Sequence, residues 1–317
     1  MSKENELKTL IIENFGQAAL QLPDIYEKGW TFPLAEDNLE EAAEILVDFA
    51  KSDVVDELPP LVHRISRTFE DLKESYTGRD NVYFASGMFG HELGNILGII
   101  VPSAYNIIKG GKPFLDEPGR IDKFLASLTT DRVISLGICY LASSGDEQFL
   151  AKVPLTQLQY VFMLYAFEPS GRKTAKVFPT PSEDIFSPEY LALYHIARNA
   201  PTDYDIRAEE DGDNLKISLQ DYGKGILDKN EKPLPPERFH EIFGEFSTTG
   251  GGLGLQIAKA LIDLRGGYIE VITKTKDNPA FAYRTDTKQD YLYTGPLQPK
   301  ITSTGTIFVL NVPKEIT

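Results

Sequence analysis

The chain has 317 residues, with 47 acidic and 32 basic side chains, a formal net charge of −15 and a sequence pI near 4.8. The apolar fraction of 42% and the aromatic fraction of 11% are typical of a folded protein of two or three domains and exclude a disordered or fibrous chain. The acidic balance argues against binding to nucleic acid or to an anionic membrane surface, and a single cysteine, Cys139, excludes an intrachain disulfide and a cysteine-rich metal site.

The two longest stretches without a charged residue, 93–108 and 153–167, are shorter than the roughly 18–20 apolar residues that a membrane helix needs. We therefore expect a cytoplasmic protein without membrane insertion.

Residues 1–80 carry most of the net negative charge of the chain. They hold 18 acidic and 8 basic side chains, a net charge of −10. Apolar residues at helical spacing between 38 and 50 predict short helices with acidic outer faces. Such a segment is either a solvated helical surface or an acidic docking face, and we expect it to be a regulatory or input segment.

Residues 81–147 are predicted to form a helical hairpin. An apolar seam with steps of three and four residues is typical of a helix in a bundle, and Gly110, Gly111 and Pro113 then break the chain before a second helical stretch at 118–144. Two chains that bury this seam against each other would form a four-helix bundle. The seam consists of Phe89, Leu93, Ile96, Ile100, Ser103 and Ile107.

His91 lies off this seam, on the same helical stripe as Asn95, and Glu92 follows it directly. An exposed imidazole beside a carboxylate has the chemistry of a phosphoryl acceptor, since one ring nitrogen is nucleophilic and the acid can take the proton from the other. The alternative is a surface histidine without a role.

From about residue 148 the pattern changes to that of a layered α/β domain. Short β-branched runs at 215–219, 268–273 and 306–312 predict strands, and the runs 188–199 and 255–264 predict helices.

Three signals in this region suggest a nucleotide pocket. Asn199 ends a predicted helix, and its side-chain oxygen suits a hydrated Mg²⁺. The motif D-Y-G-K-G-I, 221–226, follows a strand; Asp221 could accept a hydrogen bond from an exocyclic amine such as that of adenine, and its glycines would let the backbone approach a ligand. The motif G-G-G-L-G-L, 250–255, opens a helix whose N–H groups could face phosphate. Taken singly, each glycine cluster could also be a turn and helix cap.

In this order the motifs resemble those of the sensor histidine kinases of two-component systems, within the broader class of ATPases with the Bergerat fold. F-G-H-E-L-G-N-I-L (89–97) resembles the phospho-acceptor box, and Y-H-I-A-R-N-A (194–200) the asparagine box. D-Y-G-K-G-I and G-G-G-L-G-L resemble the two glycine boxes, and I-F-G-E-F-S-T-T (242–249) the phenylalanine box of the lid. The resemblance runs from about residue 81 to residue 313.

The resemblance implies a dimerisation and phosphotransfer hairpin (81–147) and a C-terminal two-layer α/β sandwich of the histidine kinase ATPase type (148–317). Together with the N-terminal helical segment (1–80) predicted from the apolar spacing, this makes an α+β protein. It implies that Phe243 and Phe246 pack the lid. Thr248 and Thr249 would contact phosphate, or alternatively these two threonines would have core or capping roles. His91 would be phosphorylated, Glu92 would assist proton removal and Asn95 would orient groups on the same face. Asn199 would bind Mg²⁺, and the remaining nucleotide-binding positions would be Asp221, Gly223, Gly225, Gly250, Gly252, Leu253 and Gly254.

Four departures from the family pattern stand out. His195 occupies the position of a second asparagine one turn before Asn199, where a core role competes with a phosphate contact. Pro201 and Thr202 stand where a basic residue is usual, which would weaken stabilisation of the transition-state charge. Ile96 replaces a common proline, and the segment 274–301 separates two strands that are normally joined tightly. That segment is either a protruding hairpin or a partner surface.

The sequence thus predicts a homodimeric kinase, paired through 81–147, that uses ATP and Mg²⁺ to phosphorylate His91 and then an aspartate on a separate response-regulator receiver domain. Phosphatase activity toward that regulator is a further expectation for Asn95. The alternatives are a regulator-binding phosphotransfer protein with a vestigial pocket, and an ATPase of related fold that does not need His91.

Overall fold

The computed structural model describes residues 133–155, 175–178, 184–200, 203–228, 230–244, 253–276, 278–295 and 304–315, and the single positions 9, 12 and 130. The chain divides into two compact units, Met1–Ala151 and Lys152–Thr317. The acidic segment 1–80 and the first predicted hairpin helix lie outside the described residues, apart from positions 9 and 12, so the division at residues 80 and 147 stays a prediction.

In the first unit, residues 133–142 are helical, as the sequence predicts for part of 118–144. The helix ends in a turn in which the Gly145 N–H donates to the Tyr140 carbonyl at 3.1 Å. Asp146 then caps the short 3₁₀ helix η3 (Glu147–Phe149), because its side chain accepts from the Gln148 N–H. Burial of Cys139 raises the pKa of its thiol to about 12, so this cysteine is a core residue rather than a nucleophile.

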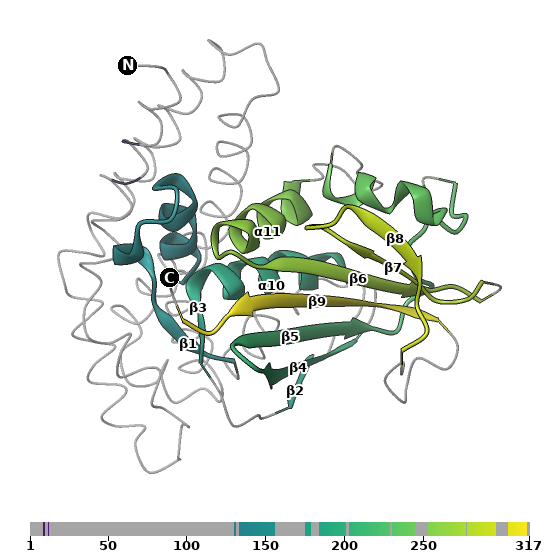
Figure 1. Cartoon of the computed structure of the whole chain (residues 1–317), viewed down its shortest axis with the longest axis horizontal. Coiled ribbons are helices and arrows are strands. Elements are labelled where there is room, and N and C mark those ends of the chain that lie inside the picture. The colour runs from purple at the N-terminus through teal and green to yellow at the C-terminus, as the bar shows by residue number, and fades with distance from the viewer. Residues whose placement is uncertain are drawn as a thin grey trace, which may run out of the picture. The chain divides into compact units, whose positions relative to one another are not determined.

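The second unit is built on a seven-stranded sheet in the order β2-β4-β5-β9-β6-β7-β8 (Figure 1). Its strands are antiparallel except that β2 runs parallel to β4. A separate antiparallel pair joins β1 to β3. The bounds are β1 Lys152–Pro154, β2 Ala175–Phe178, β3 Asp184–Phe186, β4 Tyr204–Asp211, β5 Asn214–Asp221, β6 Tyr268–Lys274, β7 Phe281–Arg284, β8 Gln289–Leu292 and β9 Gly305–Pro313.

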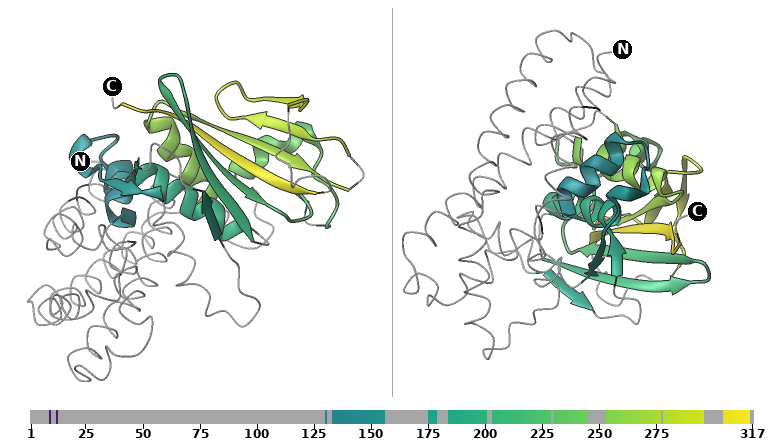
Figure 2. Two further views of the ribbon diagram at one scale, coloured as in Figure 1. Left: turned by 90° about the horizontal axis from the view of Figure 1, so that it is seen from below. Right: turned by 90° about the vertical axis from the view of Figure 1, so that its left-hand side faces the viewer.

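Two helices pack against each other on one face of this sheet, α10 (Ser187–Asn199) and α11 (Leu253–Leu264) (Figures 1 and 2). Pro188 lies in the first turn of α10, where a missing N–H costs nothing. The helix α11 ends at Gly266, whose φ of +69° allows the left-handed turn in which the Gly267 N–H donates to the Ile262 carbonyl. Both helices match their predicted positions, so the α+β architecture is confirmed.

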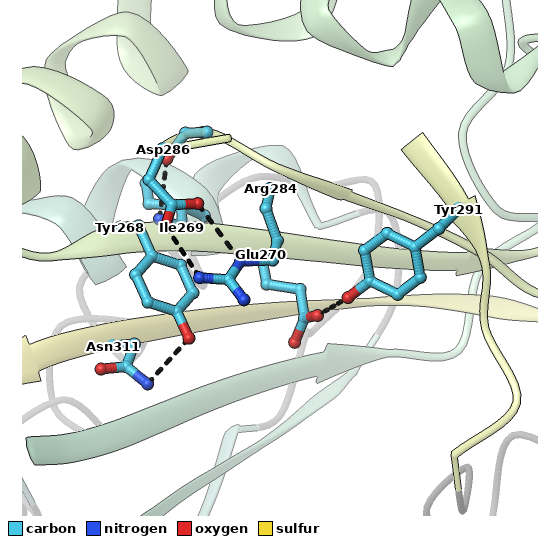
Figure 3. A network of polar contacts seen from close by, with 8 residues as sticks. Tyr268, Ile269, Glu270, Arg284, Asp286, Tyr291 and Asn311 are labelled. Carbon is cyan, nitrogen blue, oxygen red and sulfur yellow. Dashed lines mark hydrogen bonds and ion pairs between the residues drawn. The ribbon is translucent and has the colours of Figure 1, made fainter. Parts of the chain in front are cut away.

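The alternation of side chains along the strands defines two faces of the sheet. Ile217 on β5, Ile269 and Val271 on β6 and Leu310 on β9 are completely buried, on the face that carries the helices. The residues between them in the central strands, such as Lys216 and Glu270, belong to the opposite face. Side chains of that face on β6, β7, β8 and β9, with Asp286 of the turn after β7, form the polar network drawn in Figure 3.

A buried ion pair ties the two helices to the end of β9. Arg265 Nε donates to Glu189 Oε1 at 2.7 Å, and Arg265 Nη2 donates to the Pro313 carbonyl at 3.0 Å. The side chains of Arg265 and Glu189 are 2% and 1% exposed. The guanidinium also lies 4.8 Å from the ring centre of Phe186.

The segment 274–301 contains the hairpin that the sequence allowed, and its role as a partner surface stays a prediction. Within it, β7 and β8 form an antiparallel hairpin that extends the sheet beyond β6. Among the residues described here, no helix is long and apolar enough to cross a membrane.

Candidate functional site

Two contacts build the candidate site. The end of β5 with the glycine loop after it meets the start of β9 at Asp221, and the last turn of α10 meets the first turn of α11 at Asn199 and Gly254. Gln220 pairs with Ile307 in the ladder between β5 and β9, so Asp221 and Thr306 come side by side just beyond it.

Asp221 is a buried carboxylate with fixed hydrogen bonds. It is 4% exposed, and its Oδ1 accepts from the Gly223 N–H at 2.8 Å and from the Thr306 N–H at 3.2 Å. Burial raises the pKa of this carboxyl group, and the hydrogen bonds from Gly223 and Thr306 oppose that shift. The result is an acceptor held rigidly in a site of low polarity, which suits recognition of an amine hydrogen.

The loop after Asp221 needs glycine at Gly225. Its φ is +82°, and a Cβ there would lie 2.8 Å from the Lys274 carbonyl oxygen. The next N–H, of Ile226, donates to Thr273 Oγ1 at 3.0 Å. This loop is therefore held against the end of β6, which explains the glycine at position 225. The approach of the loop to a ligand stays a prediction.

The start of β9 contributes a part of the site that the sequence analysis missed. A Cβ on Gly305 would lie 2.5 Å from the backbone oxygen of Asp221, so only glycine permits this approach. Thr306, 3% exposed, supplies the second N–H to the carboxylate. The available signal is the Gly-Thr pair before the apolar run 307–310, but the sequence alone predicts only a strand there.

Asn199 lies exposed at the last residue of α10. Its Nδ2 donates to the His195 carbonyl at 2.9 Å, so its amide oxygen is the atom that remains available to a ligand. A Cβ on Gly254 would lie 3.5 Å from Asn199 Nδ2 and 3.4 Å from His195 Nδ1. The first turn of α11 therefore lies directly against the asparagine, as the two motifs in the sequence suggest.

His195 is 4% exposed and lies edge-on to the ring of Tyr194 at 5.3 Å. Its burial agrees with the core role considered from the sequence, and its contact with Gly254 also puts it beside the candidate site.

Part of the predicted lid, 228–249, is described. Asp228 Oδ1 accepts from the N–H groups of Asn230 and Lys232, which closes a tight turn. The 3₁₀ helix η5 (Pro236–Phe243) follows, and Phe243 is buried and stacks on Tyr283 of β7 at 6.1 Å. Phe243 thus packs as predicted.

The other predicted site residues lie partly outside the described residues. Leu253 is the first residue of α11, Gly223 is buried in the loop, and Gly254 lies in the first turn of the helix. Outside the described residues are His91, Glu92, Asn95, Phe246, Thr248, Thr249, Gly250 and Gly252.

The residues present fit an adenine nucleotide and Mg²⁺. Asp221 offers a buried acceptor to an exocyclic amine, and the free amide oxygen of Asn199 is a ligand type that Mg²⁺ prefers. No group of three or more His, Cys, Asp or Glu residues that could hold a metal ion occurs in the parts of the chain described above.

Comparison with known proteins agrees with this geometry. Residues 192–316 match the family described as histidine kinase-, DNA gyrase B-, and HSP90-like ATPase. This range contains Asn199, Asp221 and Gly254. No curated protein matches the chain significantly.

Solved structures of histidine kinases are similar at low identity. Two structures of the catalytic domain of the histidine kinase ThkA are 21% and 19% identical, each with a TM-score of 0.33. They cover 52% and 53% of this chain, and 95% and 99% of their own. The Acinetobacter baumannii histidine kinase AdeS is 14% identical with a TM-score of 0.33, and the match covers 70% of this chain and 97% of that one.

Proposed function

Since residues 192–316 form an ATPase domain of the histidine kinase-, DNA gyrase B-, and HSP90-like family, we propose that the chain is an ATP-dependent protein histidine kinase. It transfers the γ-phosphoryl group of ATP to His91, and from there to an aspartate on a separate response-regulator receiver domain. The observation that carries this proposal is the match of residues 192–316 to that family, with the buried acceptor Asp221 and the contact between Asn199 and Gly254 inside the matched range. The sequence adds His91 with Glu92 beside it.

In this proposal the residues of the ATPase domain bind and orient the nucleotide. Asp221 accepts a hydrogen bond from the adenine amine, and the loop 223–225 lets the backbone lie against the base. Asn199 binds Mg²⁺ through its amide oxygen, and the N-terminus of α11 faces the phosphates. Bound Mg²⁺ neutralises phosphate charge, which is the main requirement of phosphoryl transfer.

His91 accepts the phosphoryl group on a ring nitrogen. The bond between the γ-phosphorus and the bridging oxygen breaks, a phosphorus–nitrogen bond forms, and ADP leaves. Glu92 takes or orients the proton on the other ring nitrogen, which keeps the attacking nitrogen nucleophilic. Asn95 orients groups on the same face and supports any phosphatase activity toward the regulator.

The proposal includes a homodimer through residues 81–147 and a cytoplasmic location. The apolar seam supports the homodimer, and the single cysteine, Cys139, supports the location.

The test is labelling of the purified full-length protein with γ-labelled ATP and Mg²⁺, compared with His91→Ala and Asn199→Ala. We expect acid-labile, alkali-stable label in the wild type and none in either variant. Binding of ATP itself should persist in His91→Ala, because this residue is not in the nucleotide site, and that measurement serves as the folding control.

Two other outcomes would replace the proposal. Tight ATP binding without any label would indicate a phosphotransfer or regulator-binding protein with a vestigial pocket, which the absence of a basic residue at Pro201 and Thr202 favours. Release of inorganic phosphate at an unchanged rate in His91→Ala would indicate an ATPase of related fold.

A further inference from the structure

The hairpin of β7 and β8 has no role in the proposed function. It belongs to the segment 274–301, which departs from the family pattern in sequence, and it makes β8 the last strand of the sheet (Figure 1). An edge strand presents main-chain N–H and C=O groups that no neighbouring strand satisfies.

The register of the hairpin identifies these groups. The Tyr293 N–H donates to the Ala280 carbonyl at 2.9 Å, toward β7. In an antiparallel pair, successive residues direct their main-chain groups alternately toward and away from the neighbour. Tyr291 therefore bonds to β7 like Tyr293, whereas Asp290 and Leu292 direct their N–H and C=O groups away from the sheet.

The edge is short and carries one charged side chain, Asp290, but it lacks three other features that block strand addition: proline, lysine and a bulge. All four residues of β8 are exposed, and Tyr291 and Leu292, 37% and 54% exposed, are two of the three exposed large apolar residues in the described part of the chain. The residues Gln289–Leu292 contain no proline and no basic side chain, and they pair with β7 through four consecutive positions without a bulge.

Side-chain contacts on the face of the sheet opposite to the helices hold the hairpin in place (Figure 3). The Tyr291 hydroxyl bonds to Glu270 of β6, and Arg284 donates two hydrogen bonds to Asp286 while lying 4.0 Å from the ring centre of Tyr268. A strand that is already ordered loses little conformational entropy when a partner pairs with it.

The chemistry of the edge also defines the partner. Asp290 pairs with Tyr283, whose ring stacks on Phe243, so Asp290 and Leu292 share the face of the hairpin that carries η5. A strand added beside β8 would set one side chain opposite the Asp290 carboxylate and another opposite Leu292. A basic residue suits the first position and an apolar residue the second.

We propose that β8 is a docking edge for an extended segment of a partner protein, which pairs with Asp290 and Leu292 and carries a basic residue opposite Asp290. A second copy of this chain fits less well. A register centred on Tyr291 would set Asp290 against Leu292 of the second copy, and one centred on Asp290 would bring two carboxylates together. A register centred on Leu292 would pair the leucines but leave Asp290 opposite Thr294 rather than a basic residue, and each chain carries a net charge of −15. The proposal does not depend on the proposed kinase activity.

The test begins with a random peptide library selected on the full-length protein. An enriched peptide is then synthesised with a fluorophore, and its affinity is measured by anisotropy for the wild type and three variants. Leu292→Pro removes an outward N–H without breaking a bond to β7, Asp290→Lys reverses the charge, and Gln289→Ala is the matched control, since its main-chain groups face β7. Nucleotide binding is measured for each variant as the control for folding.

We expect an alternating peptide with a basic residue. Leu292→Pro should weaken its binding at least about tenfold, and Gln289→Ala should leave it unchanged. Asp290→Lys should weaken this peptide and strengthen a version with glutamate at the basic position. The absence of any enriched peptide, or binding that is indifferent to Leu292→Pro, overturns the proposal. Concentration-dependent self-association that Leu292→Pro abolishes overturns it in favour of pairing between copies of the chain.

Discussion

At the scale of single residues, Asp221 has the most exacting environment in the candidate site. Its carboxylate is buried, which disfavours the charged form, yet two backbone N–H groups are directed at Oδ1 and favour that form. A protonated carboxyl group could no longer offer the same acceptor to an adenine amine. The protonation state of this residue should therefore control nucleotide binding.

We predict that ATP binding weakens as the pH falls, and that this loss begins at a higher pH than it would if Asp221 had the pKa of an ordinary aspartate. Burial raises the pKa of Asp221 above the usual value of about 3.9, so the deprotonated form that binds is lost as the pH falls through this raised pKa. Titration calorimetry across the acidic range would measure the dependence. Asp221→Asn should bind weakly at all pH values and remove this inflection, and Asp213→Asn, an exposed control in the turn between β4 and β5, should retain it. The prediction would be contradicted if the ATP affinity of the wild type stayed constant until the pH reached the pKa of an ordinary aspartate.

Two glycines in left-handed conformations differ in their surroundings. Gly225 has a φ of +82° and no space for a Cβ, since Lys274 O, Thr275 Cγ2 and Thr273 Oγ1 all lie within 3.0 Å of that position. Gly212 has a φ of +62° and nothing within 4 Å. A substitution at Gly212 therefore reports the cost of backbone strain alone, whereas one at Gly225 adds a steric clash.

We predict that Gly212→Ala lowers the free energy of unfolding by about 1–2 kcal/mol through backbone strain alone. Gly225→Ala should cost more than this and should also weaken ATP binding, because the loop after Asp221 must move away from the end of β6. Urea denaturation followed by circular dichroism would give the first quantity and calorimetry the second. Equal effects of the two substitutions would show that the contact with β6 does not constrain the loop.

At the scale of elements, the buried pair of Glu189 and Arg265 fixes the ends of α10, α11 and β9. Burial raises the pKa of Glu189, and the neighbouring Arg265 opposes this shift by favouring the carboxylate. A buried charge without its partner is costly, whereas an exposed pair contributes little.

We predict that Arg265→Met lowers the free energy of unfolding by about 3–5 kcal/mol. The matched control is Lys259→Met in the same region of α11, which breaks the exposed pair with Asp263 and should cost at most about 1 kcal/mol. The double change Glu189→Met with Arg265→Met should recover part of the loss, since no uncompensated charge remains. A loss in Arg265→Met no larger than in the control would mean that the pair does not stabilise the domain. Urea denaturation would measure all three variants.

The elements that the sequence predicted are those with an unbroken pattern. The helices α10 and α11 and the strands β5, β6 and β9 carry regular apolar spacing, and a proline or a glycine lies at or near one end of each. The strand β4 was missed because its second half, Glu209–Asp211, is exposed and acidic and resembles a loop. The short strands β7 and β8 lack apolar alternation, since every residue of β8 is exposed.

The site could be predicted only where a motif lies within one segment. Asp221 and Asn199 lie in contiguous motifs, so their chemistry could be inferred without knowing the fold. The contribution of Thr306 depends on the pairing of β9 with β5, which joins residues 85 positions apart. The residues around Thr306 in the sequence do not indicate a contact with a residue so far away along the chain.

At the scale of the whole molecule, the nucleotide site and the proposed phosphoryl acceptor belong to different units. All described residues of the candidate site lie in the unit Lys152–Thr317, and His91 belongs to Met1–Ala151. The first unit also contains most of the acidic excess of the chain, in residues 1–80. Binding and transfer should therefore be separable functions.

We predict that the fragment 152–317 folds alone and binds ATP with an affinity within about threefold of the full chain, a difference of less than 1 kcal/mol. It contains the complete sheet, both helices and the buried ion pair, so no strand of the seven-stranded sheet loses its neighbour.

The fragment should take up no label from γ-labelled ATP, because it lacks His91. Added to full-length Asn199→Ala, which retains His91, it should restore labelling of the longer chain if the two units can meet in trans. Calorimetry and labelling resolved by chain size would measure the two properties. Loss of ATP binding in a folded fragment would show that residues before 152 complete the site, and label on the fragment itself would exclude His91 as the acceptor.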